Sequence, residues 1–113
     1  MESGEGREVR EFDEASDGQR VQAVVGEQFR VKLKENPTTG FRWKLDADRA
    51  GLLSLLGERF EPAGLQPGEG GVHTWEFQCA EQGEAALAFT SSRSWEAGAP
   101  ARRFFLTAEI GRP

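Results

Sequence analysis

Apolar and polar residues alternate through most of this 113-residue chain, and a period of two is the pattern of β-strands that bury one face. The clearest case is residues 28–35, in which Phe29, Val31 and Leu33 alternate with basic residues. Weaker or shorter alternations occupy residues 21–25, 41–46, 75–79, 85–89 and 104–110, and Val9 with Phe12 suggests a short edge strand. Turn-forming residues interrupt these segments roughly every 8–12 residues, which predicts an all-β fold, an antiparallel β-sandwich of seven to eight strands.

Residues 50–60 follow neither period cleanly. The four leucines in this segment fit one helical turn, whereas residues 58–61 alternate as a strand does. These leucines are Leu52, Leu53, Leu55 and Leu56. We expect a short turn or helical piece that runs into a strand.

The net charge of −5 lies entirely at the N-terminus. Residues 1–17 contain seven acidic and two basic side chains, and residues 18–113 contain twelve of each. A neutral domain lacks the basic face that binding to nucleic acid requires. We expect residues 1–8 to form an acidic flexible lead-in and residues 9–113 to form a single domain.

Cofactor and membrane classes are disfavoured by composition. No apolar run reaches the roughly 18 residues of a membrane-spanning helix. The chain does not begin as a signal peptide does, so we expect a cytoplasmic protein unless a leader was removed. One Cys and one His cannot supply a disulfide or a four-ligand zinc site, so we expect no metal and no other cofactor. We also expect a monomer.

A catalytic interpretation is also disfavoured. His73 and Cys79 lie six residues apart in one predicted strand, which separates them by roughly 20 Å. Cys79 falls on the apolar face of that strand and is expected in the core, whereas His73 is expected at the surface or rim. A Ser–His–Asp site that pairs His73 with a serine within residues 91–94 lacks a nucleophile-elbow motif. We therefore expect no enzyme and no catalytic residues.

Three irregular segments remain as candidates for binding. Asn36-Pro37-Thr38-Thr39-Gly40 is a stiff loop, since Pro37 fixes its own φ and Gly40 permits a positive one. The second segment is the glycine-rich stretch 64–71, and the third contains Arg93 and Trp95, residue types enriched at binding hot spots. An ordinary turn, a solvated connector and a Trp folded onto its own domain are the alternatives. Alternate loops of a Greek-key sandwich gather at one end, so the three are expected to be neighbours.

The order of these motifs resembles a known family. Asn36-Pro37-Thr38-Thr39-Gly40-Phe41, then Trp43, then Gly70-Gly71 leading into an aromatic strand, then Arg93-Ser94-Trp95, is similar to chagasin and related inhibitors of papain-family cysteine proteases. The resemblance covers residues 7–111. It implies an immunoglobulin-like sandwich without disulfides, and reversible, non-covalent inhibition by three loops at residues 36–40, 64–72 and 91–98.

The resemblance also implies a role for each loop. The first would enter the protease cleft over the catalytic cysteine, the second would run beside the non-primed side, and the third would pack against the primed side. The residues it assigns to protease binding are Asn36, Pro37, Thr38, Thr39, Gly40, Phe41, Gly70, Gly71, Val72, His73, Arg93, Ser94 and Trp95. Ser94 replaces the family's usual proline, which loosens the third loop. An immunoglobulin-like interaction module with a different partner is the alternative function.

Overall fold

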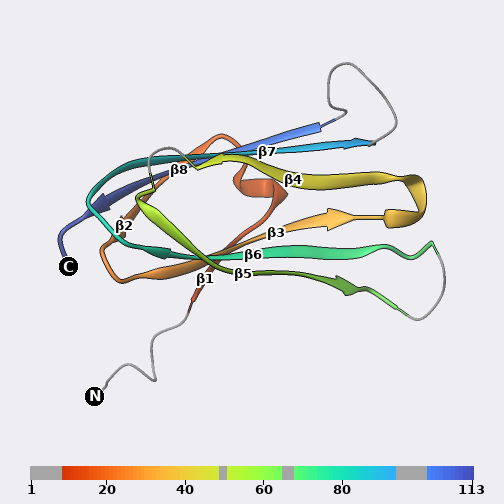
Figure 1. Cartoon of the computed structure of the whole chain (residues 1–113), viewed down its shortest axis with the longest axis horizontal. Coiled ribbons are helices and arrows are strands. Elements are labelled where there is room, and N and C mark those ends of the chain that lie inside the picture. The colour runs from red at the N-terminus through yellow and green to blue at the C-terminus, as the bar shows by residue number, and fades with distance from the viewer. Residues whose placement is uncertain (1–8, 49–50, 65–67, 94–101) are drawn as a thin grey trace.

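The computed structural model describes residues 9–48, 51–64, 68–93 and 102–113, and these form eight strands and two short 3-10 turns (Figure 1). In chain order the elements are β1 (Arg10–Phe12), η2 (Glu14–Ser16), β2 (Gln19–Val24), β3 (Gln28–Glu35), η3 (Pro37–Thr39), β4 (Phe41–Asp48), β5 (Leu53–Pro62), β6 (Gly71–Cys79), β7 (Gly83–Arg93) and β8 (Arg102–Gly111). None of the helical segments in these ranges has the length or apolar character to cross a membrane.

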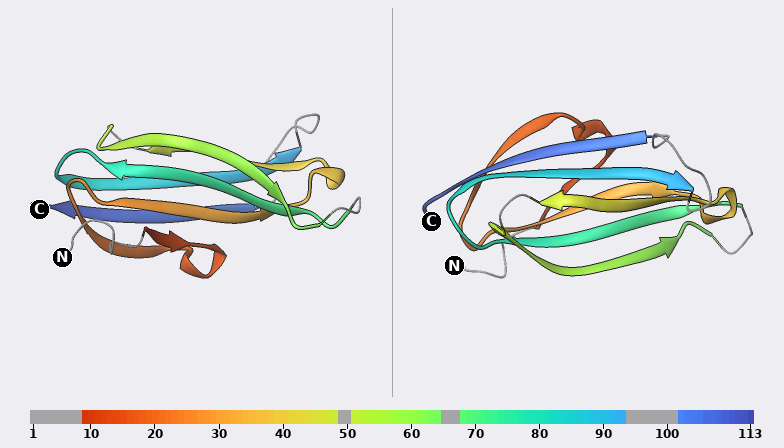
Figure 2. Two further views of the ribbon diagram at one scale, coloured as in Figure 1. Left: turned by 90° about the horizontal axis from the view of Figure 1, so that it is seen from below. Right: turned by 45° about the horizontal axis from the view of Figure 1, so that its top comes forward.

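The strands form two four-stranded sheets that lie face to face (Figures 1 and 2). One sheet has the order β1-β3-β6-β5 and the other has the order β2-β8-β7-β4. This arrangement confirms the predicted all-β sandwich. Two of the pairings are parallel, β1 with β3 and β2 with β8, and the others are antiparallel.

The alternating residues supply the core between the sheets. Phe29, Val31 and Leu33 of β3 are at most 2% exposed. The ring of Trp75 from β6 meets that of Phe89 from β7 edge to face, with centroids 4.7 Å apart, so aromatic packing joins the two sheets. Cys79 is 1% exposed, as predicted for a core residue. Burial raises the pKa of its thiol, which keeps the sulfur unreactive.

Of the two alternatives expected before the strand, a turn or a helical piece, the described residues show a turn at Gly51 and no helix. Leu53 begins strand β5, an edge strand that pairs with β6. The register shifts between Leu55 and Gly57, as in a β-bulge. Leu55 and Leu56 are 50% and 48% exposed, so the spacing of these leucines reflects an interrupted edge strand rather than a buried helical face.

Three connections between strands lie at the same end of the sandwich. β3, β5 and β7 finish at this end, and β4, β6 and β8 begin there (Figure 1). This confirms the expected gathering of alternate loops. The described parts of these connections are η3 with its flanking residues, residues 63–64 and 68–70, and the two strand ends at Arg93 and Arg102.

Candidate functional site

The first loop is a single 3-10 turn fixed by its own residues. The side-chain Oδ1 of Asn36 accepts hydrogen bonds from the backbone N–H of Thr38 at 3.1 Å and from its hydroxyl at 2.7 Å. Pro37 occupies the start of the turn, and Gly40 ends it with φ at 84°, in the left-handed region. The conformational roles predicted for these residues are confirmed. Thr38 and Thr39 are exposed at the tip.

The second loop lies directly against the first. The Nδ2 of Asn36 donates to the carbonyl oxygen of Gly68 at 3.0 Å. Farther down, the N–H of Ala63 donates to Gly70 O at 2.8 Å, which closes the loop where β5 and β6 separate. A Cβ atom on Gly71 would lie 2.2 Å from the carbonyl oxygen of Glu61, so only glycine fits there.

Arg93, at the end of β7, joins the third connection to the first loop. Its Nε donates to Thr39 O at 2.9 Å, and its guanidinium lies 4.2 Å from the centre of the Phe41 ring. The other two residues expected in this loop, Ser94 and Trp95, lie outside the described residues, so their contribution stays a prediction.

The structure thus gathers most of the predicted binding residues on one end of the sandwich, with His73 set below it. Only 13% of the His73 side chain is exposed, and the imidazole stacks on the Trp75 ring with centroids 4.0 Å apart. His73 is therefore intermediate between the core and the surface, which fits the expected rim position and not an open surface position. Its phase within β6 explains this, because His73 alternates with Trp75 and faces the same way.

Sequence reasoning missed Glu35, which is 7% exposed. It continues the inward-facing alternation of Phe29, Val31 and Leu33, and that phase was the available signal. One of its carboxylate oxygens accepts the backbone N–H of Trp43 at 2.5 Å, and the other lies 3.2 Å from His73 Nδ1.

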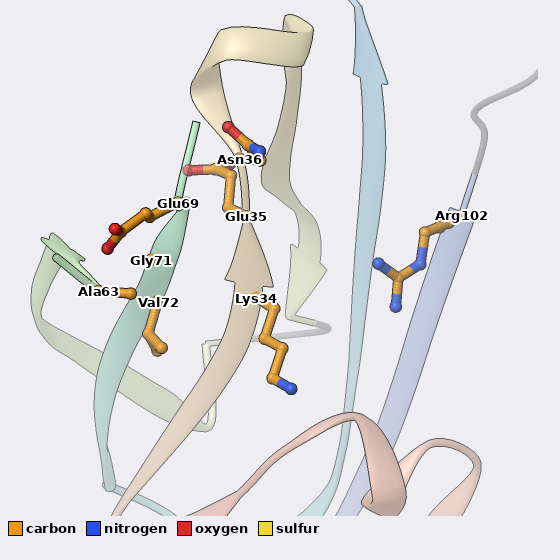
Figure 3. Close-up of a pocket in the computed structure, with 9 residues that line it drawn as sticks. Lys34, Glu35, Asn36, Ala63, Glu69, Gly71, Val72 and Arg102 are labelled. Carbon is orange, nitrogen blue, oxygen red and sulfur yellow. The ribbon is translucent and has the colours of Figure 1, made fainter. Parts of the chain in front are cut away.

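An open pocket of about 460 Å³ lies beside Glu35 (Figure 3). Lys34 from β3, Arg102 from β8 and Glu69 from the second loop are among the residues that line it (Figure 3). The lining therefore mixes both signs of charge. Within the described ranges, no cluster of three or more His, Cys, Asp or Glu side chains could hold a metal ion.

The geometry at His73 does not support nucleophilic catalysis. Its Nδ1 faces Glu35, and its Nε2 lies 2.7 Å from a carboxylate oxygen of Glu58. With both ring nitrogens engaged by carboxylates, the imidazole has none left to activate a serine hydroxyl. What this end of the sandwich offers is a shaped, rigid surface.

Comparison with known proteins agrees with this description. The family model described as chagasin family peptidase inhibitor I42 matches residues 22–109. Chagasin from Trypanosoma cruzi is 27% identical over 86 residues, which cover 72% of this chain and 78% of that protein.

Solved structures of similar proteins share the fold. The cysteine protease inhibitor EhICP2 from Entamoeba histolytica has a TM-score of 0.80 at 18% identity, over 90% of this chain and 94% of that one. PbICP-C, solved in complex with falcipain-2, has a TM-score of 0.68 at 11% identity, over 90% of each chain. Since the family model spans most of the sandwich, including the first two loops and Arg93, the chain belongs to the chagasin family of peptidase inhibitors.

Proposed function

We propose that this protein inhibits a papain-like cysteine protease reversibly and without a covalent bond, by inserting the loop end of its sandwich into the active-site cleft. The observation that carries the proposal is the direct contact among the loops. Asn36 bonds to Gly68 of the second loop, and Arg93 of the third connection bonds to Thr39. The described parts of the three segments are therefore in direct contact.

The first loop suits a wedge that is not cleaved. The carbonyl oxygen of Asn36 accepts the N–H and the hydroxyl of Thr39, that of Pro37 accepts the N–H of Gly40, and that of Thr39 accepts from Arg93. A scissile carbonyl must instead turn toward the donors of the protease's oxyanion hole. Three carbonyls of this loop are held by the inhibitor's own donors, so the loop can cover the nucleophile without acting as a substrate.

The same hydrogen bonds favour affinity. Ordering a flexible loop on binding costs free energy, and a loop already held in its bound shape avoids much of that cost. We assign contact with the protease to residues 36–41 and 70–72, to Arg93, and, from the family resemblance, to Ser94 and Trp95. In this mechanism the chain acts by occupying the cleft and catalyses nothing.

The test is a titration of papain and of several cathepsin L-type enzymes with the purified protein. We expect competitive inhibition at or below micromolar concentration. Thr39→Arg places a bulky cation at the exposed tip of the wedge, and Trp95→Ala removes an expected aromatic anchor, so each should raise Ki at least about tenfold.

The matched control is Ser54→Arg, the same added charge at an exposed position where β5 begins, away from the loops. Its Ki should stay within about twofold of the wild-type value. No inhibition of any enzyme in the panel would contradict the proposal. If the protein inhibits but both loop variants keep the wild-type Ki, the inhibitory surface lies elsewhere.

A further inference from the structure

A polar network lies beneath the first two loops, buried at Glu35 and exposed at Glu58. The Glu35 side chain is 3% exposed, and its two carboxylate oxygens reach different strands. One accepts the backbone N–H of Trp43 at 2.5 Å, and the other lies 3.2 Å from His73 Nδ1. His73 Nε2 in turn lies 2.7 Å from Glu58 Oε2.

Glu35, Trp43 and His73 stand next to the loops, and Glu58 lies farther along β5. Glu35 is the last residue of β3, directly before the first loop, and Trp43 is the third residue after that loop. His73 is the third residue of β6, just after the second loop, and Glu58 lies on β5, which leads into it. The network therefore joins the base of one loop to the base of the other.

The Trp43 contacts also cross between the sheets. β3 and β4 belong to different sheets, and β4 is an edge strand that pairs only with β7. The Trp43 N–H finds its acceptor in Glu35 of the facing sheet, and the indole Nε1 donates to Lys34 O at 2.8 Å. These two hydrogen bonds set the distance between β3 and β4 at the base of the first loop.

We propose that Glu35 and His73 are positioning residues of the inhibitor, which set the spacing between the 36–41 loop and the 68–72 loop from below without touching the protease. This inference rests on the proposed function and reassigns His73 from contact to support. A buried carboxylate is costly unless it is fully bonded, so the two loop bases are held where Glu35 can satisfy both partners. Loops that are already held in their bound arrangement lose less conformational freedom on binding.

The test compares Glu35→Gln, His73→Gln and the double variant. A glutamine at 35 keeps one oxygen to accept the Trp43 N–H and replaces the charged oxygen that faces His73 with a neutral amide, so the fold is retained while the charge-assisted contact beneath the loops is weakened. We expect each single variant to raise Ki about tenfold. Because both substitutions affect the same contact, the Ki of the double variant should stay within about threefold of the higher of the two single-variant Ki values.

The control for lost stability is Ile110→Val. Ile110 is 5% exposed and pairs with Gly83, at the opposite end of the sandwich from the loops. Trimming it destabilises the core without reaching the loops, so its Ki should stay within about twofold of wild type. Ki values of Glu35→Gln and His73→Gln that match this control would overturn the inference.

A spectroscopic readout separates loop spacing from inhibition. The side-chain amide of Asn36 donates to Gly68 O, so its NMR resonance reports whether the two loops stay in register. It should shift in Glu35→Gln and in His73→Gln and stay in place in Ile110→Val. An unmoved resonance in both network variants would contradict the positioning role. If the wild-type protein inhibits no protease, the proposed function fails, whereas this resonance still decides whether the network sets the loop spacing.

Discussion

At the scale of single residues, Gly71 is a position of the binding end where backbone atoms leave no room for a side chain. An added Cβ there would lie 2.2 Å from Glu61 O and 2.8 Å from Pro62 Cα, both backbone atoms of the paired strand β5. At Gly57, by contrast, the nearest atom to an added Cβ is the flexible carboxylate of Glu76, at 3.7 Å.

These two glycines make a matched pair of substitutions. Gly71→Ala must push β5 and β6 apart where the second loop begins, so it should lower the free energy of unfolding by about 1–3 kcal/mol. Gly57→Ala meets only ordinary contact and should change it by less than about 0.5 kcal/mol. Urea unfolding of both variants measures the difference, and equal midpoints would contradict the close approach at Gly71.

The residue types of the first loop predicted its conformation, but they did not predict the contacts that Glu35 makes beneath it. Asn36, Pro37 and Gly40 have conformational preferences that act locally, so the sequence alone indicated the turn. The role of Glu35 depends on Trp43 from the other sheet and on His73 from β6, and no local preference encodes such contacts. The phase of the strands did place both polar side chains on the inward face, and this was the readable signal.

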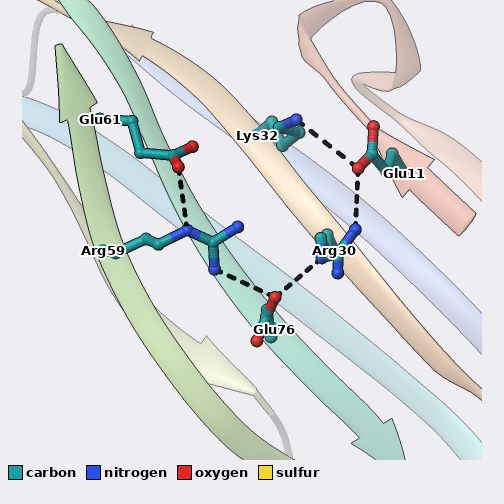
Figure 4. A network of polar contacts seen from close by, with 6 residues as sticks. All are labelled: Glu11, Arg30, Lys32, Arg59, Glu61 and Glu76. Carbon is teal, nitrogen blue, oxygen red and sulfur yellow. Dashed lines mark hydrogen bonds and ion pairs between the residues drawn. The ribbon is translucent and has the colours of Figure 1, made fainter. Parts of the chain in front are cut away.

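At the scale of elements, the outward face of the β1-β3-β6-β5 sheet carries a chain of ion pairs (Figure 4). A carboxylate oxygen of Glu76 on β6 accepts from Arg30 of β3 at 2.8 Å and from Arg59 of β5 at 3.0 Å. The hydrogen bonds from Arg30 and Arg59 hold the pKa of Glu76 below its ordinary value. Glu76 thus links the strands on either side of β6.

This network predicts a pH dependence of stability. Because the pKa of Glu76 is lower in the folded chain than in the unfolded one, its carboxylate stabilises the fold at neutral pH, and this contribution is lost as pH falls through the folded-state pKa. Glu76→Gln should lower Tm at pH 7, and the difference from wild type should shrink as the pH falls below about 4, the ordinary range of a glutamate. Thermal unfolding across this range tests it, with Glu81→Gln in the β6–β7 turn as the control. A difference that stays constant with pH would contradict the assignment.

The elements were predictable where strands are buried and regular. The segment 28–35 has the bounds expected of it. Its inward-facing residues stand at every second position, which makes the alternation of the strand clear. The start of β5 was ambiguous because an edge strand tolerates exposed leucines and a bulge, and both obscure the period of two. The parallel pairings of β1 and β2 depend on where the chain crosses between sheets, which local alternation does not specify.

At the scale of the whole molecule, the sandwich works as a frame that brings separate chain segments to one end. The strand directions place the three connections together, and hydrogen bonds from Asn36 and Arg93 join them. The family resemblance predicted which segments form the binding end, because the order of their motifs along the chain is characteristic of the family. How tightly they hold one another is a property of the folded molecule alone.

Hydrogen exchange on the complex with an inhibited papain-like protease tests the binding end most directly. On complex formation, the backbone amides of residues 38–41 and 68–72 and of Arg93 should exchange more slowly. Those of Gly26 and Gly83, at the opposite end, should be unchanged. Protection confined to the opposite end, or to the exposed edge of β5, would contradict the account.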